Sequence, residues 1–97
     1  MRIEYHPSLV DELHEIRSYY NARVDTLGDQ FVDEFEQYVL RIAAAPKLWM
    51  VVDGDIRRAL LRRFPFVIFF REVDETTLRI LVVKHQRRHP NYGKNRL

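Results

Sequence analysis

The chain has 97 residues, a formal net charge of +2 and no cysteine, and 46% of its residues are hydrophobic, 31% charged and 12% aromatic. This composition predicts one small globular domain over residues 1–97, because the chain is too apolar for disorder and too charged for a membrane span. The absence of cysteine excludes disulfide bonds, thiolate metal sites and a cysteine nucleophile, and it suits the cytoplasm, where we expect the protein to reside.

The first half of the chain predicts a short strand followed by two amphipathic helices. Residues 1–6 alternate in the manner of a strand. Two stripes of apolar side chains follow at the helical spacings of three and four residues. The first stripe consists of Leu9, Leu13, Ile16 and Tyr20, and the second consists of Leu27, Phe31, Phe35, Tyr38 and Ile42. Because the connection between them is short, the two helices should form an antiparallel hairpin that buries one shared face.

Capping signals mark the starts of both helices. Ser8 stands three residues before Asp11, and Thr26 stands three residues before Asp29, so each pair resembles the side-chain cap of a helix N-terminus. Pro46 cannot continue a helix, and it ends the second one.

After Pro46 the apolar period changes to that of strands. A turn at residues 53–55 precedes a strand at 57–63, and residues 66–70 are apolar on both faces, as in a central strand. In a last strand, at 78–84, strict alternation places Leu78, Ile80 and Val82 on one face and Arg79, Leu81 and Val83 on the other. The predicted order is β-α-α-β-β-β. It describes a helical hairpin packed on a small antiparallel sheet, in the α+β class.

The small net charge hides a strong asymmetry between the two halves of the chain. Residues 1–55 contain five Lys and Arg against eleven Asp and Glu, whereas residues 56–97 contain eleven Lys and Arg against three Asp and Glu. This separation predicts a basic face that meets a polyanion or an acidic protein. The alternative is that the charges only keep the surface solvated.

One cluster in the basic half has the residue types that RNA cleavage requires. Attack by a 2′-hydroxyl needs a base, a cation for the phosphorane and an acid for the leaving oxygen. These roles could be filled by His85, Arg87, Arg88, His89 and Tyr92. The sequence has no metal-ligand spacing and no glycine-rich phosphate loop, so we expect no metal and no cofactor.

Three blocks of the basic half resemble the RelE/ParE toxins of bacterial type II toxin–antitoxin systems. They are residues 55–61 (DIRRALL), 63–71 (RFPFVIFFR) and 80–90 (ILVVKHQRRHP). The most specific features are the Phe-Pro-Phe entry to the central strand and the His-x-Arg-x-x-Pro exit from the last strand. Weaker similarity at residues 5–7, 15–20 and 45–46 extends the resemblance over nearly the whole chain.

The resemblance implies a RelE/ParE-like fold and a toxin that inhibits growth and takes part in plasmid stabilisation. ParE-like members of the family poison DNA gyrase without catalysis, whereas RelE-like members are mRNA interferases that cut messages on the ribosome. RelE-like nucleases carry an arginine roughly where this chain has Pro65 and Phe66. The sequence therefore favours a ParE-like gyrase inhibitor. The alternative is an endoribonuclease in which Arg87 or Arg88 stabilises the phosphate, while His85, His89 or Tyr92 moves the proton.

The resemblance also implies a cognate antitoxin whose acidic segment folds on binding, lies along the helical hairpin and reaches the sheet, giving a hetero-oligomer. No membrane partner is expected. The candidate residues for binding the target or the antitoxin are Arg57, Arg58, Arg62, Arg63, Arg79, Lys84, Tyr20 and Trp49. Several have a structural alternative: Trp49 could anchor a small core, His85 could be an ordinary strand histidine, and the arginines could form a polar sheet face.

Overall fold

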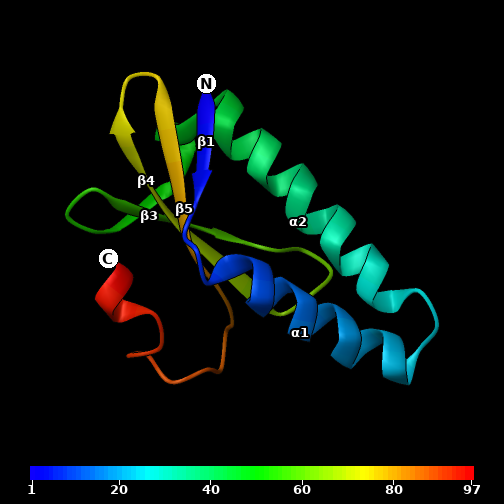
Figure 1. Ribbon diagram of the computed structural model, residues 1–97. Coiled ribbons are helices and arrows are strands. Elements are labelled where there is room, and N and C mark those ends of the chain that lie inside the picture. Colours follow the sequence, from blue (N-terminus) through cyan, green and yellow to red (C-terminus); the bar gives the residue numbers. More distant parts are fainter.

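The computed structural model describes all 97 residues and shows two helices packed on a five-stranded sheet (Figure 1). The elements are β1 (Arg2–Tyr5), α1 (Leu9–Arg23), α2 (Leu27–Ala44), the short 3-10 helix η1 (Pro46–Leu48), β2 (Met50–Asp53), β3 (Ile56–Leu60), β4 (Phe66–Asp74), β5 (Thr77–His85) and the 3-10 helix η2 (Lys94–Arg96). The predicted α+β class and helical hairpin are confirmed. No helix has both the length and the apolar character needed to cross a membrane.

The sheet has the strand order β1-β5-β4-β3-β2 and differs from the prediction in two respects. It is mixed rather than wholly antiparallel, because β1 pairs in parallel with β5 while the other neighbours are antiparallel. Parallel neighbours need a long connection, and the chain between β1 and β5 contains the helical hairpin and strands β2 to β4. The prediction also lacked β2, whose four residues are all exposed and so carry no alternating pattern.

The predicted side-chain caps are absent at both helix starts. Neither Ser8 nor Thr26 makes a side-chain cap hydrogen bond. At α2 the backbone N–H of Gly28 instead donates to Oδ1 of Asn21, in the preceding helix, at 2.7 Å. Asp29 accepts from Nε of Arg17, also at 2.7 Å. The two helices lie so close at their connection that side chains from α1 satisfy the polar groups that a local cap would otherwise satisfy.

The main core fills the space between the hairpin and the sheet. It is a cluster of 14 buried residues, namely Leu9, Phe31, Phe35, Val39, Ile42, Ala59, Leu61, Phe64, Phe66, Ile68, Phe70, Leu78, Ile80 and Val83. The remaining residues of both predicted stripes are partly buried against it. The hairpin therefore buries the shared face that its apolar period predicted.

A β-bulge in β5 changes which side chains face the helices. Phe69 pairs with Val82, but the next residue of β4, Phe70, pairs with Ile80, so Leu81 is an extra residue in β5. Beyond a bulge, the side chains exchange faces. Val83 consequently joins Ile80 in the main core, and Val82 lies on the outer face. The strict alternation predicted for this strand holds as far as Leu81 and was wrong for Val82 and Val83.

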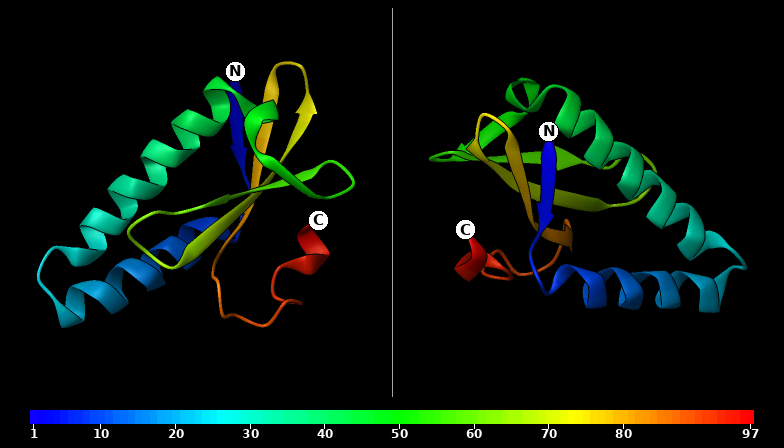
Figure 2. Two further views of the ribbon diagram at one scale, coloured as in Figure 1. Left: turned by 180° about the vertical axis from the view of Figure 1, so that it is seen from behind. Right: turned by 45° about the horizontal axis from the view of Figure 1, so that its top comes forward.

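The outer face of the sheet, opposite the helices, has a much smaller apolar cluster. It consists of Ile56, Leu81 and Val82, with Phe69 and Tyr92 packed against it. Tyr92 belongs to the C-terminal segment after β5, which runs along the side of the sheet away from α2 (Figure 2). The C-terminal segment therefore helps to cover the face that the helices leave open.

Candidate functional site at the end of strand β5

Two grooves meet where β5 leaves the sheet. The inner groove, of about 390 Å³, lies between α1, the end of β5 and the C-terminal segment. The outer groove, of about 380 Å³, lies on the outer face of the sheet. Lys84 and Arg88 line both grooves, and the two side chains form what we call the basic ridge.

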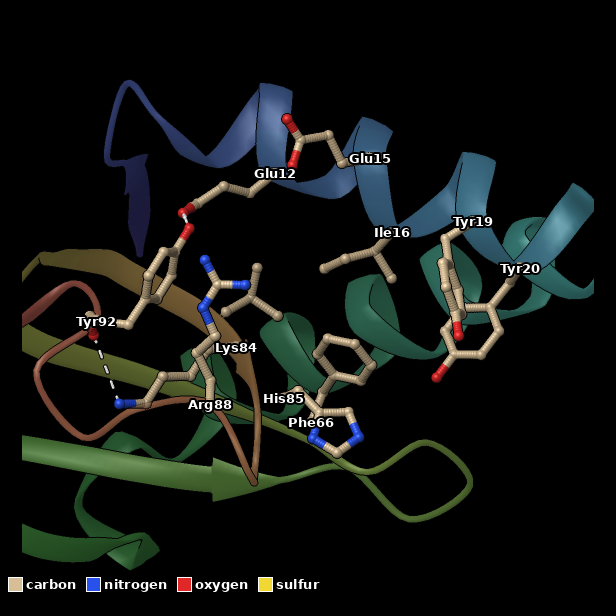
Figure 3. A pocket seen from close by; sticks show the side chains of 11 residues that line it. Glu12, Glu15, Ile16, Tyr19, Tyr20, Phe66, Lys84, His85, Arg88 and Tyr92 are labelled. Atoms are coloured by element: carbon tan, nitrogen blue, oxygen red, sulfur yellow. Dashed lines mark hydrogen bonds between the residues drawn. The ribbon is translucent and has the colours of Figure 1, made fainter.

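The inner groove has aromatic and apolar walls. Ile16 and Tyr20 line it from α1, and Phe66 and His85 line it from the sheet (Figure 3). The His85 ring meets the Phe66 ring edge to face, with 5.3 Å between centroids. Burial raises the pKa of Tyr20, and the neighbouring Tyr19 raises it further, so this phenol stays neutral at physiological pH. The groove thus offers ring surfaces for an apolar or aromatic group.

The outer groove combines an apolar floor with cations. Leu60, Val67 and Phe69 line it from β3 and β4, and Arg58 adds a guanidinium beside the basic ridge. Leu60 is 46% exposed, so the floor is open to a partner. This surface suits a segment with both apolar side chains and negative charges.

The two cations of the basic ridge have no carboxylate within 4.0 Å. The Lys84 ammonium donates to the backbone carbonyls of Pro90 and Tyr92 at 3.3 and 3.5 Å, and burial lowers its pKa. The Arg88 guanidinium lies over the Tyr92 ring, 4.2 Å from its centroid, and points toward α1 (Figure 3). Both charges are therefore available to an incoming carboxylate or phosphate.

Three other cations of the basic half are already in ion pairs within the chain. The three ion pairs are Arg71 with Asp55 at 2.9 Å, Arg79 with Glu4 at 2.9 Å, and Arg96 with Glu12 at 2.7 Å. The excess positive charge of this half is thus not spread evenly over its surface. The basic ridge and Arg58 retain unpaired charge next to a groove.

The five candidate nuclease residues do not all meet. His85, Arg88 and Tyr92 line the inner groove, whereas Arg87 and His89 are exposed and line neither groove. Nδ1 of His85 accepts from the backbone N–H of Arg87 at 3.0 Å, and Nδ1 of His89 accepts from that of Asn91 at 3.1 Å. Both rings thus use one nitrogen to hold turns of the C-terminal segment.

Tyr92 is held in a way that makes its proton hard to remove. Its hydroxyl donates to the carboxylate of Glu12. Burial raises the pKa of Tyr92, and the hydrogen bond and charge of Glu12 raise it further. A phenol in this environment is a poor general base at physiological pH.

Comparison with known proteins identifies the family. The family described as "ParE toxin of type II toxin-antitoxin system, parDE" matches residues 3–90. The chain belongs to this ParE toxin family. Among solved structures, the toxin is similar to the "Chromosomal ParDE TA system from P. aeruginosa", with a TM-score of 0.74 and 18% identity over 88% of this chain and 95% of that chain. At this identity the likeness shows the shared fold. No curated protein matches the sequence.

Three other candidate residues of this ParE-family toxin make contacts within the chain. The Arg57 guanidinium donates to the backbone carbonyls of Lys47 and Trp49, at 3.2 and 2.7 Å, and holds the segment before β2. Arg63 donates to Oε1 of Gln30 at 2.8 Å. Trp49 packs on the main core, which is the structural alternative considered for it. In contrast, Arg62 is exposed and has no polar partner within the chain.

Sequence reasoning missed the acidic side of the toxin's inner groove. Glu12, Glu15 and Tyr19 line it from α1, and Glu12 pairs with Arg96, 84 residues away. Glu12 stands on the polar stretch of an amphipathic helix, where most carboxylates are simply solvated. No local pattern distinguishes it, because its partner comes from the opposite end of the chain.

Proposed function

We propose that this ParE-family toxin inhibits growth by binding DNA gyrase through the basic ridge, without catalysing a reaction, and that its antitoxin covers the same ridge. Gyrase is the target implied by the sequence's resemblance to the ParE-like side of the family. The single observation that carries the proposal is the position of Lys84 and Arg88. They are unpaired cations between two grooves that each have apolar side chains in their walls or floor.

This arrangement favours binding to a protein surface. A partly desolvated cation attracts an acidic side chain more strongly than one fully in water, and apolar floors on both sides add burial of carbon surface. Neither groove needs to enclose a small substrate for such contacts to form. The basic ridge and the two grooves beside it therefore suit a large protein target that binds over the surface.

The same site is poorly equipped for RNA cleavage. Phe66 presents an aromatic ring where RelE-like nucleases have a cation, and this ring packs against His85. Arg88 and Lys84 are the only cations that line the inner groove, and Tyr92 donates its proton to Glu12. A nuclease would have to stabilise the phosphorane and move two protons with these groups alone.

The antitoxin we propose is an acidic, amphipathic segment that folds on binding. Its carboxylates would pair with Lys84, Arg88 and Arg58, and its apolar side chains would enter the two grooves. The product is a toxin–antitoxin hetero-oligomer in the cytoplasm, where gyrase is also found. Because antitoxin and gyrase would use the same ridge, their binding should be mutually exclusive.

The test compares two activities of the purified toxin. One assay measures supercoiling of relaxed plasmid by bacterial DNA gyrase, and the other measures mRNA cleavage by primer extension in a bacterial translation extract. We expect inhibited supercoiling and intact mRNA. Codon-phased cuts with normal supercoiling would overturn the proposal in favour of the RelE-like endoribonuclease.

Two adjacent arginines provide a matched pair of variants. Both arginines are exposed, but Arg88 lines both grooves and belongs to the ridge, whereas Arg87 lines neither groove. Arg88→Ala should raise the toxin concentration needed for half-inhibition of supercoiling by about tenfold or more, the loss typical of a central charged contact. Arg87→Ala should change it less than about twofold. Equal losses in both variants would show that the tail acts through its overall charge and not through the ridge.

A further inference from the structure

The C-terminal segment is fixed although it has no strand or α-helix of its own. We call residues 86–97 the strap. It begins at the C-terminal end of β5 and returns to the N-terminal end of α1 (Figures 1 and 3). It carries Arg88, which belongs to the basic ridge, and Tyr92, which lines the inner groove. The position of these binding residues therefore depends on what holds the strap.

A buried ion pair holds the far end of the strap. The Arg96 guanidinium donates to both carboxylate oxygens of Glu12, at 2.7 and 2.8 Å, and also to the carbonyl of Leu81 at 3.3 Å. The side chains of Arg96 and Glu12 are only 11% and 12% exposed. Burial raises the pKa of Glu12, but the hydrogen bonds from Arg96 and Tyr92 and the charge of Arg96 outweigh it and lower the pKa. Glu12 is thus ionised and fully engaged.

The middle of the strap rests on the outer face of the sheet. Gly93 has a φ of +73°, and a Cβ at this position would lie 2.8 Å from Cγ2 of Val82. Tyr92 packs on the small outer cluster, and its carbonyl accepts from Lys84. These contacts determine where the strap lies, but they include no strand pairing that would hold it without the ion pair.

Glu12 and Arg88 line the same inner groove, although they do not form an ion pair. Glu12 could neutralise Arg88 if it were not already bound by Arg96. The Glu12–Arg96 pair therefore has two effects: it closes the strap, and it keeps a largely buried carboxylate of the inner groove from pairing with Arg88.

We propose that Glu12 and Arg96 are positioning residues for the basic ridge: together they hold the strap that carries Arg88, and they leave Arg88 unpaired. The inference rests on the proposed function only in making the ridge the binding surface. It predicts that the two residues are not equivalent. Removing Arg96 frees a carboxylate in the groove that Arg88 also lines, whereas removing the charge of Glu12 frees none.

The test is a double-mutant cycle of Glu12→Gln, Arg96→Met and the two combined. Amide hydrogen exchange of residues 86–97 in the free toxin measures strap closure without any partner. Growth arrest after induced expression, normalised to soluble toxin, measures activity whichever target is correct. Arg17→Met is the matched control, because it also breaks an ion pair of α1, with Asp29 at 2.7 Å, but far from the strap.

We expect both single variants to accelerate exchange in the strap by about tenfold or more, because each leaves a buried charge or dipole without its partner. Arg96→Met should lose about tenfold in toxicity, and Glu12→Gln should lose less. Adding Glu12→Gln to Arg96→Met should restore part of the toxicity. Arg17→Met should change neither measurement. Thermal unfolding followed by circular dichroism establishes that each variant is folded.

Unchanged strap exchange in both single variants would overturn the anchoring role. Faster exchange with undiminished toxicity would overturn the positioning role. Equal loss in both single variants with no recovery in the double variant would refute the claim that Arg96 shields Arg88 from Glu12. Growth arrest with normal gyrase activity would contradict only the proposed target, because the exchange and toxicity measurements do not depend on gyrase.

Discussion

The two faces of the sheet are built differently. The helix-covered face buries a cluster of 14 apolar residues that includes five phenylalanines. The outer face has a cluster of three, covered partly by the strap, and the basic ridge lies at its margin. One face therefore provides most of the hydrophobic stabilisation, and the other has unpaired cations at its margin.

This division explains how so short a chain can combine stability with the binding surface that we propose. A domain of this size can bury only a limited share of its surface, so one well-packed face must supply most of the folding free energy. The outer face is then free to keep charges that would destabilise a core. Substitutions on the two faces should accordingly affect different measurements.

The largest expected effect lies in the core under α2. Phe31 is fully buried and packs edge to face on Phe64 and Phe66, with centroid distances of 5.3 and 5.0 Å. Phe31→Ala should lower the free energy of unfolding in urea by about 3–5 kcal/mol. Leu40→Ala, in the same helix but 66% exposed, should change it by less than about 0.5 kcal/mol. Similar losses of unfolding free energy in the two variants would contradict the claim that the helix-covered face provides most of the stability.

The next effect concerns the contact between the helices. A Cβ on Gly28 would lie 2.0 Å from the backbone carbonyl oxygen of Arg17, so the helices must separate to accommodate it. Gly28→Ala should cost about 1–3 kcal/mol in the same urea experiment. Gly54, with a φ of +55° and open space around it, is the control. Gly54→Ala should cost about 1 kcal/mol, from backbone strain alone. A larger loss at Gly54 would place the critical constraint in the β2–β3 turn.

The corresponding glycine of the outer face should behave differently. In Gly93→Ala, the added Cβ would be strained by the positive φ and would also clash with the side chain of Val82. We expect hydrogen exchange to accelerate throughout the strap, while the free energy of global unfolding falls by less than about 1 kcal/mol, because the strap can open alone. If global stability fell as much as in Gly28→Ala, the strap would have to be part of the same cooperative unit as the core.

The smallest effect is a pH dependence of the strap. The pKa of Glu12 is lowered in the folded protein, so its ionised form stabilises the closed strap above the ordinary glutamate pKa of about 4.5. This stabilisation is lost as the pH falls through the lowered pKa. Exchange protection of residues 90–97 should therefore decrease in acid before the core unfolds. Glu12→Gln should abolish the pH dependence, and its persistence in that variant would assign it to another group.

Most of the fold could be predicted because its signals are local. The apolar stripes of α1 and α2 and the apolar run around Ile68 follow from periods of a few residues. The exposed strand β2 was missed, since a strand without a buried face has no alternation to detect. The bulge at Leu81 was missed because its register is set by the partner strand.

The grouping of the candidate site residues follows in part from the sequence. Lys84, His85, Arg88 and Tyr92 were singled out from one basic stretch, and the structure brings them to one groove. The sequence did not show which of Arg87 and Arg88 lines the grooves. The two residues are adjacent and have identical side chains, so only the backbone conformation of the folded strap decides it.

The amino-acid sequence by itself determined the α+β class, the helical hairpin, the asymmetry of charge and the membership of a toxin family, since periodicity, composition and motif blocks are properties of neighbouring residues. Only the tertiary structure decided which cations stay unpaired. That outcome depends on Glu12 meeting Arg96 and Glu4 meeting Arg79 across 84 and 75 residues. Ion pairs form between side chains that folding brings together, and nothing in the local sequence specifies those distances.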